Sequence, residues 1–267
     1  MTPEGLHTLD AAIARDLVGV FCDIDDTLTW EGRLVPDAFL ALQRLRDAGL
    51  RVVPVTGRPA GWVDHIARMW PVDGCVGENG GLWFWMEEDG LRRGFLQDAA
   101  TRAEHRGRLD ALAASILAEV PGTALASDQP YRELDLAVDF CEDVDPLPQR
   151  AIDDIVAAFQ RAGATCKVSS IHVNGWYGDF DKRVGCRNLV RDAFGEDLDD
   201  SRDRWLYVGD SANDEPMFAA FPYACGVANV RDFLPRMKAW PRWIARGSGG
   251  HGFAEIADRV LDLRGSK

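Results

Sequence analysis

Three carboxylates lie within four positions at the end of an apolar run. The run covers residues 17–22, and Asp23, Asp25 and Asp26 follow it, with Thr27 next. Like charges this close repel one another, and a buried carboxylate is unfavourable unless a cation or hydrogen-bond donors compensate it. The segment is therefore either a solvated turn at the end of a strand or one side of a cation-binding site.

A second apolar run, WLYVG at residues 205–209, ends at Asp210. In open parallel sheets the ligand crevice lies beyond the carboxyl ends of the strands, so two such strands would bring Asp23, Asp25 and Asp210 together. An oxygen-rich site of this kind suits Mg²⁺, which takes one or two protein carboxylates and completes its shell with water and phosphate oxygens. The pairing of the two runs favours a magnesium site over a solvated turn.

The chain resembles the haloacid dehalogenase superfamily in four motifs that occur in the family's order. They are DIDDTLT at 23–29, VTGR at 55–58, Lys182 and GDSANDEPM at 209–217. GGHGFAEIA at 249–257 is similar to the end of one branch of the family. Relatives often have glycine directly after the lysine of the third motif, whereas two residues separate Lys182 from Gly185 here. Lys167 is the alternative lysine.

The resemblance implies a phosphatase that uses Mg²⁺ and forms an aspartyl phosphate. Asp23 is then the expected nucleophile. Asp25 is the expected proton carrier, and its presence points to phosphate esters rather than carbon–halogen bonds. Thr56 and Lys182 are expected to contact the phosphate and complete the catalytic set. The expected metal ligands are Asp23, Asp25, Asp210 and Asp214.

Further residues are expected around the phosphate and the leaving group. They are Asp26, Thr27, Gly57, Arg58, Asn174, Trp176 and Asn213. We expect Thr27 to brace the turn through a hydrogen bond to Asp25, and the backbone N–H of Asp26 to face the phosphate. Asp25 would also offer its backbone carbonyl to the metal. An alternative for Asp214 is the orientation of Lys182.

The elements that must position these residues follow an α/β pattern. Apolar strands are expected at about 17–24, 50–55, 74–76, 205–209, 223–227 and 242–245, with helices between them, among these 36–48 and 59–69, and a final helix from about 253. Helices that alternate with apolar strands are typical of a parallel sheet with crossover connections. We therefore predict a Rossmann-like α/β core.

The pattern changes in the middle of the chain, where antiparallel signals appear. They are a hairpin at Asp89–Gly90, a helix at 101–119, a half-exposed strand at 132–140, a helix around 152–159 and a strand at 165–173. We predict an inserted α+β cap domain at 90–178, within a core formed by 1–89 and 179–267. The insertion resembles the large cap of the Cof-like and sucrose-phosphatase branch (subfamily IIB), and GENGG at 77–81 is similar to that branch's core-to-cap segment.

Side chains of the insertion would select the leaving group. Asn174 and Trp176 are expected to contact a sugar-like group, and Arg132 and Glu133 are additional candidates. The alternative for Trp176 is packing at the seam between core and cap. The alternative for Thr56 in the core is helix capping.

Composition narrows the class of partner and the location. The net charge of −13 argues against nucleic acid and anionic membranes as partners. Apolar residues make up 46%, and no run approaches the ~18 apolar residues that a bilayer span needs. Glu4 and Asp10 interrupt any signal-peptide pattern, so we expect a cytoplasmic protein. The cysteines occur without CxxC spacing, which argues against zinc.

The expected substrate is a small phosphate ester, either a sugar phosphate or a related phospho-polyol or phospho-acid. The expected assembly is a monomer or a homodimer. One alternative is a phosphomutase of the same superfamily, which returns the phosphoryl group to its substrate. Another is a non-catalytic sugar-phosphate-binding protein, although the presence of Asp23, Asp25, Lys182 and Asp210 argues against it, because a pure binder has no use for acid–base groups.

Overall fold

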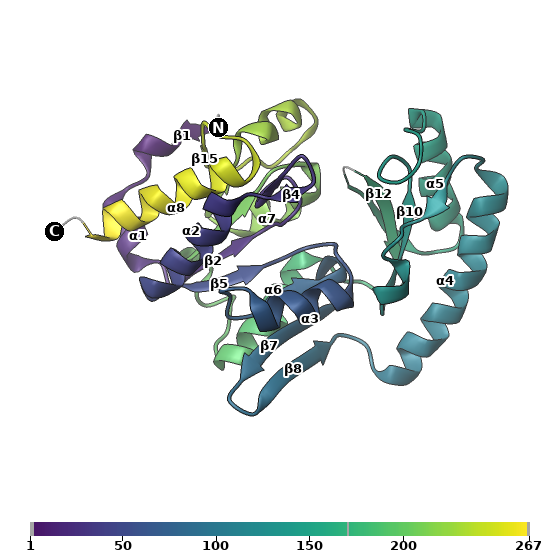
Figure 1. The fold of residues 1–267 in the computed structure, drawn as a ribbon, viewed down its shortest axis with the longest axis horizontal. Helices are drawn as coiled ribbons and strands as arrows, with labels where there is room; N and C mark the ends of the chain where they lie inside the picture. Colours follow the sequence, from purple (N-terminus) through teal and green to yellow (C-terminus); the bar gives the residue numbers. More distant parts are fainter. Residues whose placement is uncertain (1–2, 170, 266–267) are drawn as a thin grey trace.

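A six-stranded parallel sheet lies at the centre of the larger part of the molecule (Figure 1), in a computed structural model that describes residues 3–169 and 171–265. Its strands, in spatial order, are β1 (Glu4–Gly5), β15 (Trp243–Ile244), β14 (Tyr223–Gly226), β13 (Trp205–Gly209), β2 (Gly19–Cys22) and β5 (Arg51–Pro54). Every neighbouring pair is parallel. The prediction of an α/β fold with a parallel sheet is confirmed. The edge strand β1 and the short helix α1 (Ala11–Asp16) were not predicted.

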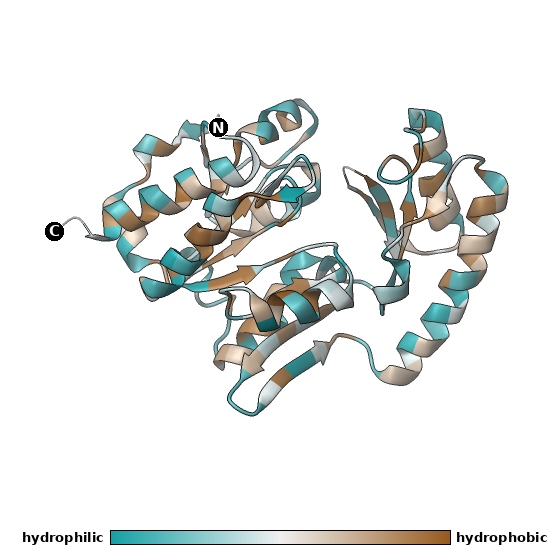
Figure 2. Cartoon of the chain, in the orientation of Figure 1, coloured by the Kyte–Doolittle hydropathy of each residue, from teal (hydrophilic) through white to brown (hydrophobic). Residues whose placement is uncertain are grey.

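Alternate residues of the central strands point to opposite faces of this sheet, as the pleat requires. Val20 and Leu206 belong to one buried cluster, whereas Phe21 and Tyr207 belong to another. The first cluster includes side chains of α2 (Pro36–Asp47), α3 (Ala60–Met69) and α8 (Gly249–Gly265). The second includes side chains of α6 (Lys182–Phe194) and α7 (Glu215–Ala220). Helices thus cover both faces, and hydrophobic residues run along the central strands (Figure 2).

Two elements near the C-terminus differ from the expected pattern. Between β14 and β15 the chain forms only 3₁₀ turns, Ala228–Asp232 and Leu234–Arg236, where a helix was predicted. Pro235 removes a backbone donor there. The last helix begins at Gly249 rather than near 253. Its first residue lies so close to the β3 backbone that a side chain at Gly249 would lie 2.4 Å from the Thr29 carbonyl oxygen. The glycines that suggested a loop allow a helix to pass close to the backbone.

Two small antiparallel units flank the parallel sheet. The hairpin of β3 (Thr29–Trp30) and β4 (Arg33–Leu34) follows the end of β2. β6 (Cys75–Gly77), β7 (Leu82–Glu87) and β8 (Gly90–Phe95) form a three-stranded sheet, which a bridge between Val55 and Val76 joins to the end of β5. The hairpin predicted at Asp89–Gly90 is present, and the predicted boundary at residue 90 falls inside it.

The inserted module, from α4 to β12, forms a separate body beside the core (Figure 1). It consists of α4 (Ala99–Glu119), β9 (Ala124–Leu125), β10 (Asp135–Asp139), α5 (Gln149–Arg161), β11 (Thr165–Val168) and β12 (His172–Trp176). Its antiparallel sheet has the order β11-β12-β10-β9, and a third buried cluster joins the sheet to both helices. The single strand predicted at 165–173 is wrong: the chain reverses between β11 and β12, with residue 170 outside the described residues.

Strand β10 also differs from the prediction, because both of its faces are buried. Leu136 and Val138 pack inside the inserted module, as expected. The opposite face carries Asp135 and Asp139, which are 0% exposed and were expected to face solvent. A buried carboxylate needs partners, and Asp135 has Arg132 as one. This face contacts the core, because the Asp135 amide donates to Oε2 of Glu78 at 3.1 Å.

In the described residues, the helices are all too short or too polar to cross a membrane.

Candidate active site

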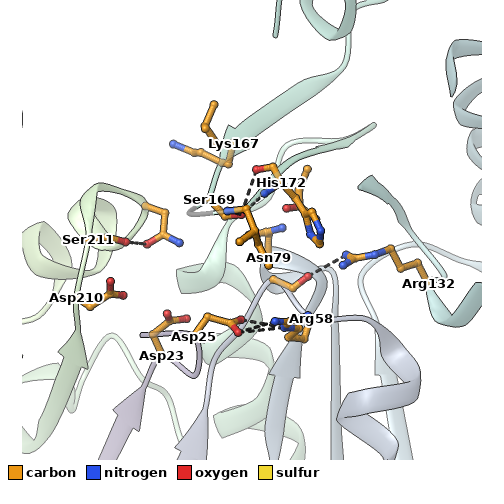
Figure 3. Close-up of a pocket in the computed structure, with 15 residues that line it drawn as sticks. Asp23, Asp25, Arg58, Asn79, Arg132, Lys167, Ser169, His172, Asp210 and Ser211 are labelled. Carbon is orange, nitrogen blue, oxygen red and sulfur yellow. Dashed lines mark hydrogen bonds and ion pairs between the residues drawn. The ribbon is translucent and has the colours of Figure 1, made fainter. Parts of the chain in front are cut away.

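A cavity of about 40 Å³ lies where the carboxyl ends of β2 and β13 meet the inserted module (Figure 3). From the core it is lined by Asp23, Asp25, Gly57, Arg58, Asn79, Asp210, Ser211 and Asn213. From the inserted module it is lined by Arg132, Lys167, Val168, Ser169, Ile171, His172 and Asn174. The structure therefore brings residues of three of the four family motifs to the wall of one cavity, and Lys182 of the remaining motif contacts Asp23 from behind that wall.

Lys182 contacts two carboxylates, of which only that of Asp23 lines the cavity. Its Nζ atom lies 2.7 Å from Oδ1 of Asp23 and 2.7 Å from Oδ1 of Asp214. Burial opposes the charge of Lys182, but Asp214 and Asp23 outweigh this effect and raise the pKa of the ammonium group. Lys182 opens α6, where the Asp181 side chain accepts hydrogen bonds from the amides of Arg183 and Val184 and so caps the helix.

Asp214 positions this lysine and does not line the cavity. It is 0% exposed, and its Oδ1 also accepts a hydrogen bond of 2.5 Å from the Tyr207 hydroxyl. Its Oδ2 accepts the backbone N–H of Asp210 at 2.9 Å. This close approach requires glycine at 209, because a side chain there would lie 2.5 Å from Oδ2 of Asp214. Of the two roles expected for Asp214, orientation of Lys182 fits these contacts better than metal ligation.

The carboxylates of Asp23, Asp210 and Asp214 form a buried acidic group whose ligand atoms all lie within 4.8 Å of one another. Burial raises the pKa of Asp23 to about 7, with Asp214 and Asp25 adding to the effect and Lys182 opposing it. Burial, together with Asp214 and Asp23, also raises the pKa of Asp210 well above its ordinary value. The single ammonium of Lys182 therefore leaves this group short of positive charge. The donor set fits a hard divalent cation such as Mg²⁺.

Two side chains hold Asp210 in place. The Thr27 hydroxyl donates to Oδ1 of Asp210 at 3.3 Å, and Nδ2 of Asn229 donates to Oδ2 at 3.2 Å. The expected hydrogen bond from Thr27 to Asp25 is not the one that forms. Thr27 is fully buried, so it supports Asp210 from below rather than contacting substrate.

Asp25 is held by Arg58 at the side of the cavity (Figure 3). Nη2 of Arg58 lies 2.8 Å from Oδ1 of Asp25, and Nε lies 3.1 Å from both carboxylate oxygens. Nη1 of the same guanidinium faces the inserted module, 3.6 Å from Oδ2 of Asp128 and 3.5 Å from Oε1 of Glu142. Arg58 thus links the expected proton carrier to acidic groups of the module.

Three other expected site residues, Asp26, Thr56 and Gly57, lie in the turns that follow β2 and β5. The amide of Asp26 donates to the Thr29 hydroxyl at 2.8 Å, so the expectation that it faces the phosphate is wrong. Asp26 has φ +56°, and this local turn consumes its donor. The Thr56 hydroxyl accepts the amide of Arg58 at 3.0 Å in the turn before α3, but the helix has Pro59 as its N-cap and no side-chain cap, so Thr56 does not cap it. Gly57 lines the cavity as expected.

The expected residues of the inserted module separate into two groups. Asn174 lines the cavity and donates from Nδ2 to Asp135 at 3.1 Å. Trp176 is 1% exposed and stacks on Phe180 with ring centroids 5.4 Å apart, away from the cavity lining. Packing at the seam is therefore the role that the geometry supports for Trp176, and the expected substrate contact is not found. The additional candidate Arg132 is buried and lines the cavity, whereas Glu133 is exposed.

Sequence reasoning missed several residues that build the site. In the sequence, Tyr207 is one residue of the apolar run that forms β13, so nothing marks its hydroxyl as part of the site. Asn229 lies outside the four motifs, after GDSANDEPM at 209–217. Glu78 and Asn79 lie in the GENGG segment, whose family likeness was recognised without a role. Nδ2 of Asn79 is buried without a hydrogen-bond partner in the described residues, and it belongs to a cavity-lining residue. Glu78 and Asn79 both have a left-handed backbone, which is rare for residues other than glycine. This feature marks the segment as unusual, and only the structure reveals it.

Comparison with known proteins decides the family. The model of haloacid dehalogenase-like hydrolases matches residues 20–92. A phosphoglycolate phosphatase from Pyrobaculum neutrophilum is 30% identical over 242 residues, which cover 90% of this chain and 93% of that protein. The chain belongs to the haloacid dehalogenase-like hydrolase family. This finding confirms the prediction made from the four motifs, and the chain is an enzyme of the phosphoric monoester hydrolase class.

Solved structures share the fold of this hydrolase over nearly its whole length. A protein from Thermoplasma acidophilum superposes with a TM-score of 0.71 at 20% identity, covering 92% of this chain and 99% of that one. The sucrose-phosphatase of Synechocystis, solved with sucrose and phosphate, superposes with a TM-score of 0.63 at 17% identity, covering 92% and 98%. The second of these belongs to the branch that the insertion resembles.

Proposed function

We propose that this hydrolase is a Mg²⁺-dependent phosphatase that cleaves a small phosphate monoester through an aspartyl phosphate. The observation that carries the proposal is the arrangement of Asp23 and Asp25 at one cavity. Asp23 contacts Lys182 and lies beside Asp210, whereas Asp25 is held separately by Arg58. Two carboxylates in different electrostatic environments suit the two roles of nucleophile and proton carrier.

Asp23 is the proposed nucleophile. Its carboxylate lines the cavity while Lys182 contacts only one of its oxygens, Oδ1, among the hydrogen bonds of the described residues. Attack of a carboxylate oxygen on phosphorus forms an acyl phosphate and expels the alkoxide, and attack of water on that phosphate releases the product. Lys182, fixed by Asp214, offsets negative charge as it develops on the phosphoryl group.

Asp25 is the proposed acid and base. Protonation of the leaving alkoxide in the first step, followed by deprotonation of the attacking water in the second, returns Asp25 to its starting state. Arg58 fixes the direction of this carboxylate through a bidentate contact, in which Nε donates to Oδ2 and Nη2 donates to Oδ1. Because Arg58 also faces Asp128 and Glu142, the position of the inserted module bears on the orientation of Asp25.

The proposed metal ligands are Asp23 and Asp210, together with the Asp25 backbone carbonyl. When bound, Mg²⁺ would neutralise phosphate charge and orient the phosphoryl group. Asp214 remains a proposed support for Asp210 and Lys182. We also propose that the inserted module acts as a cap that excludes water and selects the leaving group.

The preferred substrate is proposed to be a compact phospho-acid, with 2-phosphoglycolate as the first candidate. The cavity is small, and its module side carries Lys167, Ser169, His172 and Asn174 rather than exposed aromatic rings. Lys167 is exposed and suits a carboxylate on the leaving group. The burial of Trp176 removes the ring that was expected to stack on a sugar. The phosphoglycolate phosphatase relative from Pyrobaculum neutrophilum supports the same choice.

A phosphate-release screen with Mg²⁺ tests this function. The panel contains 2-phosphoglycolate, sugar phosphates, phospho-polyols and nucleotides, with the Asp23→Asn variant as control. We expect metal-dependent phosphate release with the highest kcat/KM for 2-phosphoglycolate. Isomerisation of a sugar phosphate without phosphate release would indicate a phosphomutase instead. Binding of sugar phosphates without any conversion would indicate a binding protein.

A further inference from the structure

Glu78 is a fully buried carboxylate in a strained segment between core and inserted module. Its exposed fraction is 0%, and its φ is +43°, followed by +57° at Asn79 and +103° at Gly80. Left-handed backbone at non-glycine residues is unfavourable and persists only where the surroundings fix it. Gly80 shows how tightly they do so, because a side chain there would lie 2.0 Å from the carbonyl oxygen of Asp181, which precedes Lys182.

The carboxylate of Glu78 accepts hydrogen bonds from four backbone N–H groups. Oε1 accepts the amides of Ala60 and Glu133, each at 2.9 Å. Oε2 accepts the amides of Leu134 at 2.6 Å and Asp135 at 3.1 Å. Ala60 begins α3 of the core, whereas the other three donors lead into β10 of the inserted module. One side chain of the core therefore holds the start of a strand that belongs to the other body.

A reciprocal contact runs in the opposite direction. Nη1 of Arg132, on the inserted module, donates to the carbonyl oxygen of Gly57 at 2.9 Å. The same guanidinium is held by Asp128 and by Asp135, at 3.0 Å and 2.9 Å. Gly57 belongs to the loop that lines the cavity beside Arg58. The two contacts together fix β10 against the loop that follows β5.

The place of β10 determines where the module's polar groups lie. Asn174 of β12 pairs with Ala137 of β10 across the strands, and its Nδ2 donates to Oδ2 of Asp135. Lys167 of β11 pairs with Asn174 in turn. A shift of β10 would therefore move Asn174 and Lys167 together, away from Asp23 and Asp25.

We propose that Glu78 is a positioning residue that sets substrate selectivity by holding β10, and with it Asn174 and Lys167, at a fixed distance from the core carboxylates. This inference rests on the proposed phosphatase function and adds to it the residue that couples the inserted module to the site. Glu78 does not line the cavity, so its effect passes through the module rather than through contact with substrate.

The Glu78→Gln variant tests the inference, with Glu133→Gln as the matched control. Glutamine keeps one acceptor oxygen and turns an NH₂ group toward amide donors, so two of the four amide contacts are lost. Glu133 is exposed on the same segment, and its side chain takes no part in these contacts. Both variants are assayed with Mg²⁺ on the best substrate of the panel and on p-nitrophenyl phosphate, whose aryl leaving group needs little help from the module.

We expect Glu78→Gln to lower kcat/KM for the best substrate at least about tenfold, mainly through KM, while p-nitrophenyl phosphate changes by less than about threefold. Glu133→Gln should match the wild type on both. Equal loss on both substrates, or no loss on either, would overturn the inference. Glu78→Asp, which keeps the charge but is one methylene shorter, should show the same selectivity loss and serves if the glutamine variant does not fold.

Hydrogen exchange separates this inference from the proposed function. The amides of Leu134 and Asp135 should exchange at least about tenfold faster in Glu78→Gln, with β2 unchanged. Unchanged exchange at both amides would contradict the role of Glu78 in holding β10, even if the enzyme is active. If the wild type cleaves nothing in the panel, the proposed function fails, yet faster exchange at these amides would still support the role of Glu78 in holding β10.

Discussion

Nζ of Lys182 lies 2.7 Å from Oδ1 of Asp23, although 159 positions separate the two residues in the chain. The inserted module occupies about half of that interval, so the contact forms only when the two parts of the core come together around it. Both residues are nearly fully buried. In this environment a charge without its partner is strongly unfavourable.

Replacement of Lys182 should remove activity and also change stability. In Lys182→Met, Asp23 and Asp214 lose their shared cation, and breaking a buried pair in this way costs on the order of 3–5 kcal/mol. We expect no measurable phosphate release and a lower melting temperature, part of which Mg²⁺ restores. Lys238→Met, at an exposed lysine, is the control and should match the wild type. Full activity in Lys182→Met would favour Lys167 as the motif-three lysine.

Asp25→Asn should slow turnover without loss of ligand binding. The amide cannot shuttle a proton, and general acid–base catalysis typically contributes about 10²–10⁴-fold to the rate. Phosphate and Mg²⁺ affinities, measured by calorimetry, should stay within about fivefold of the wild type, because in the proposed site Asp25 offers the metal only its backbone carbonyl. Asp26→Asn is the neighbouring control, since asparagine also tolerates φ +56°. Equal turnover in the two variants would refute the role of Asp25.

Asp210→Asn should raise the Mg²⁺ concentration that gives half-maximal activity at least about tenfold. Loss of this carboxylate would remove a proposed metal ligand, and even changes to supporting residues typically weaken metal sites 10–100-fold. Calorimetry without substrate supplies a second readout. Asp232→Asn removes an exposed carboxylate from the turn after β14 and should leave the metal requirement unchanged. Identical Mg²⁺ titrations for both variants would place the metal elsewhere.

The stability of the protein should depend on pH through Glu78. Burial, with Asp135 as a nearby like charge, raises the pKa of Glu78 to about 7, while hydrogen bonds from backbone amides and the charge of Arg132 oppose the shift. A raised carboxyl pKa stabilises the fold fully below about pH 4.5, and this contribution is lost as pH rises through about 7. The free energy of unfolding should therefore fall between about pH 6 and 8, by on the order of 1 kcal/mol more in the wild type than in Glu78→Gln.

Urea unfolding with saturating Mg²⁺ measures this difference, because bound metal keeps Asp23 and Asp210 ionised throughout. Parallel pH curves for the wild type and Glu78→Gln would contradict the assignment. If the free energy of unfolding fell more with rising pH in Glu78→Gln than in the wild type, the pKa of Glu78 would be lowered by folding and not raised.

The core of the site was predictable because its chemistry follows strand ends. Asp23 and Asp210 each come directly after an apolar run, and parallel pairing of β2 with β13 brings them to one edge. Lys182 was found through its family motif, although the spacing to Gly185 departs from relatives. The local sequence therefore contained most of what places the carboxylates and the lysine.

The roles of the other site residues depend on contacts between segments that are far apart in the chain, and no local sequence pattern indicates such contacts. Trp176 alternates with Asn174 on β12, yet Trp176 packs on Phe180 while Asn174 reaches the cavity. Asp135 was assigned to a solvated face, because nothing in its neighbourhood reveals that the core would cover it. Glu78 takes its role from amides more than 50 positions away. Such positions are decided by how the inserted module meets the core.

Detection of phosphate on Asp23 tests the central claim most directly. Wild-type enzyme is quenched in acid during turnover with Mg²⁺ and the best substrate, and its peptides are examined by mass spectrometry. We predict a phosphoryl group on the peptide that contains Asp23, removed by hydroxylamine as an acyl phosphate requires and missing from Asp23→Asn. Phosphorylation of a different side chain, or an Asp23→Asn variant that keeps more than about a tenth of the wild-type turnover, would contradict the account.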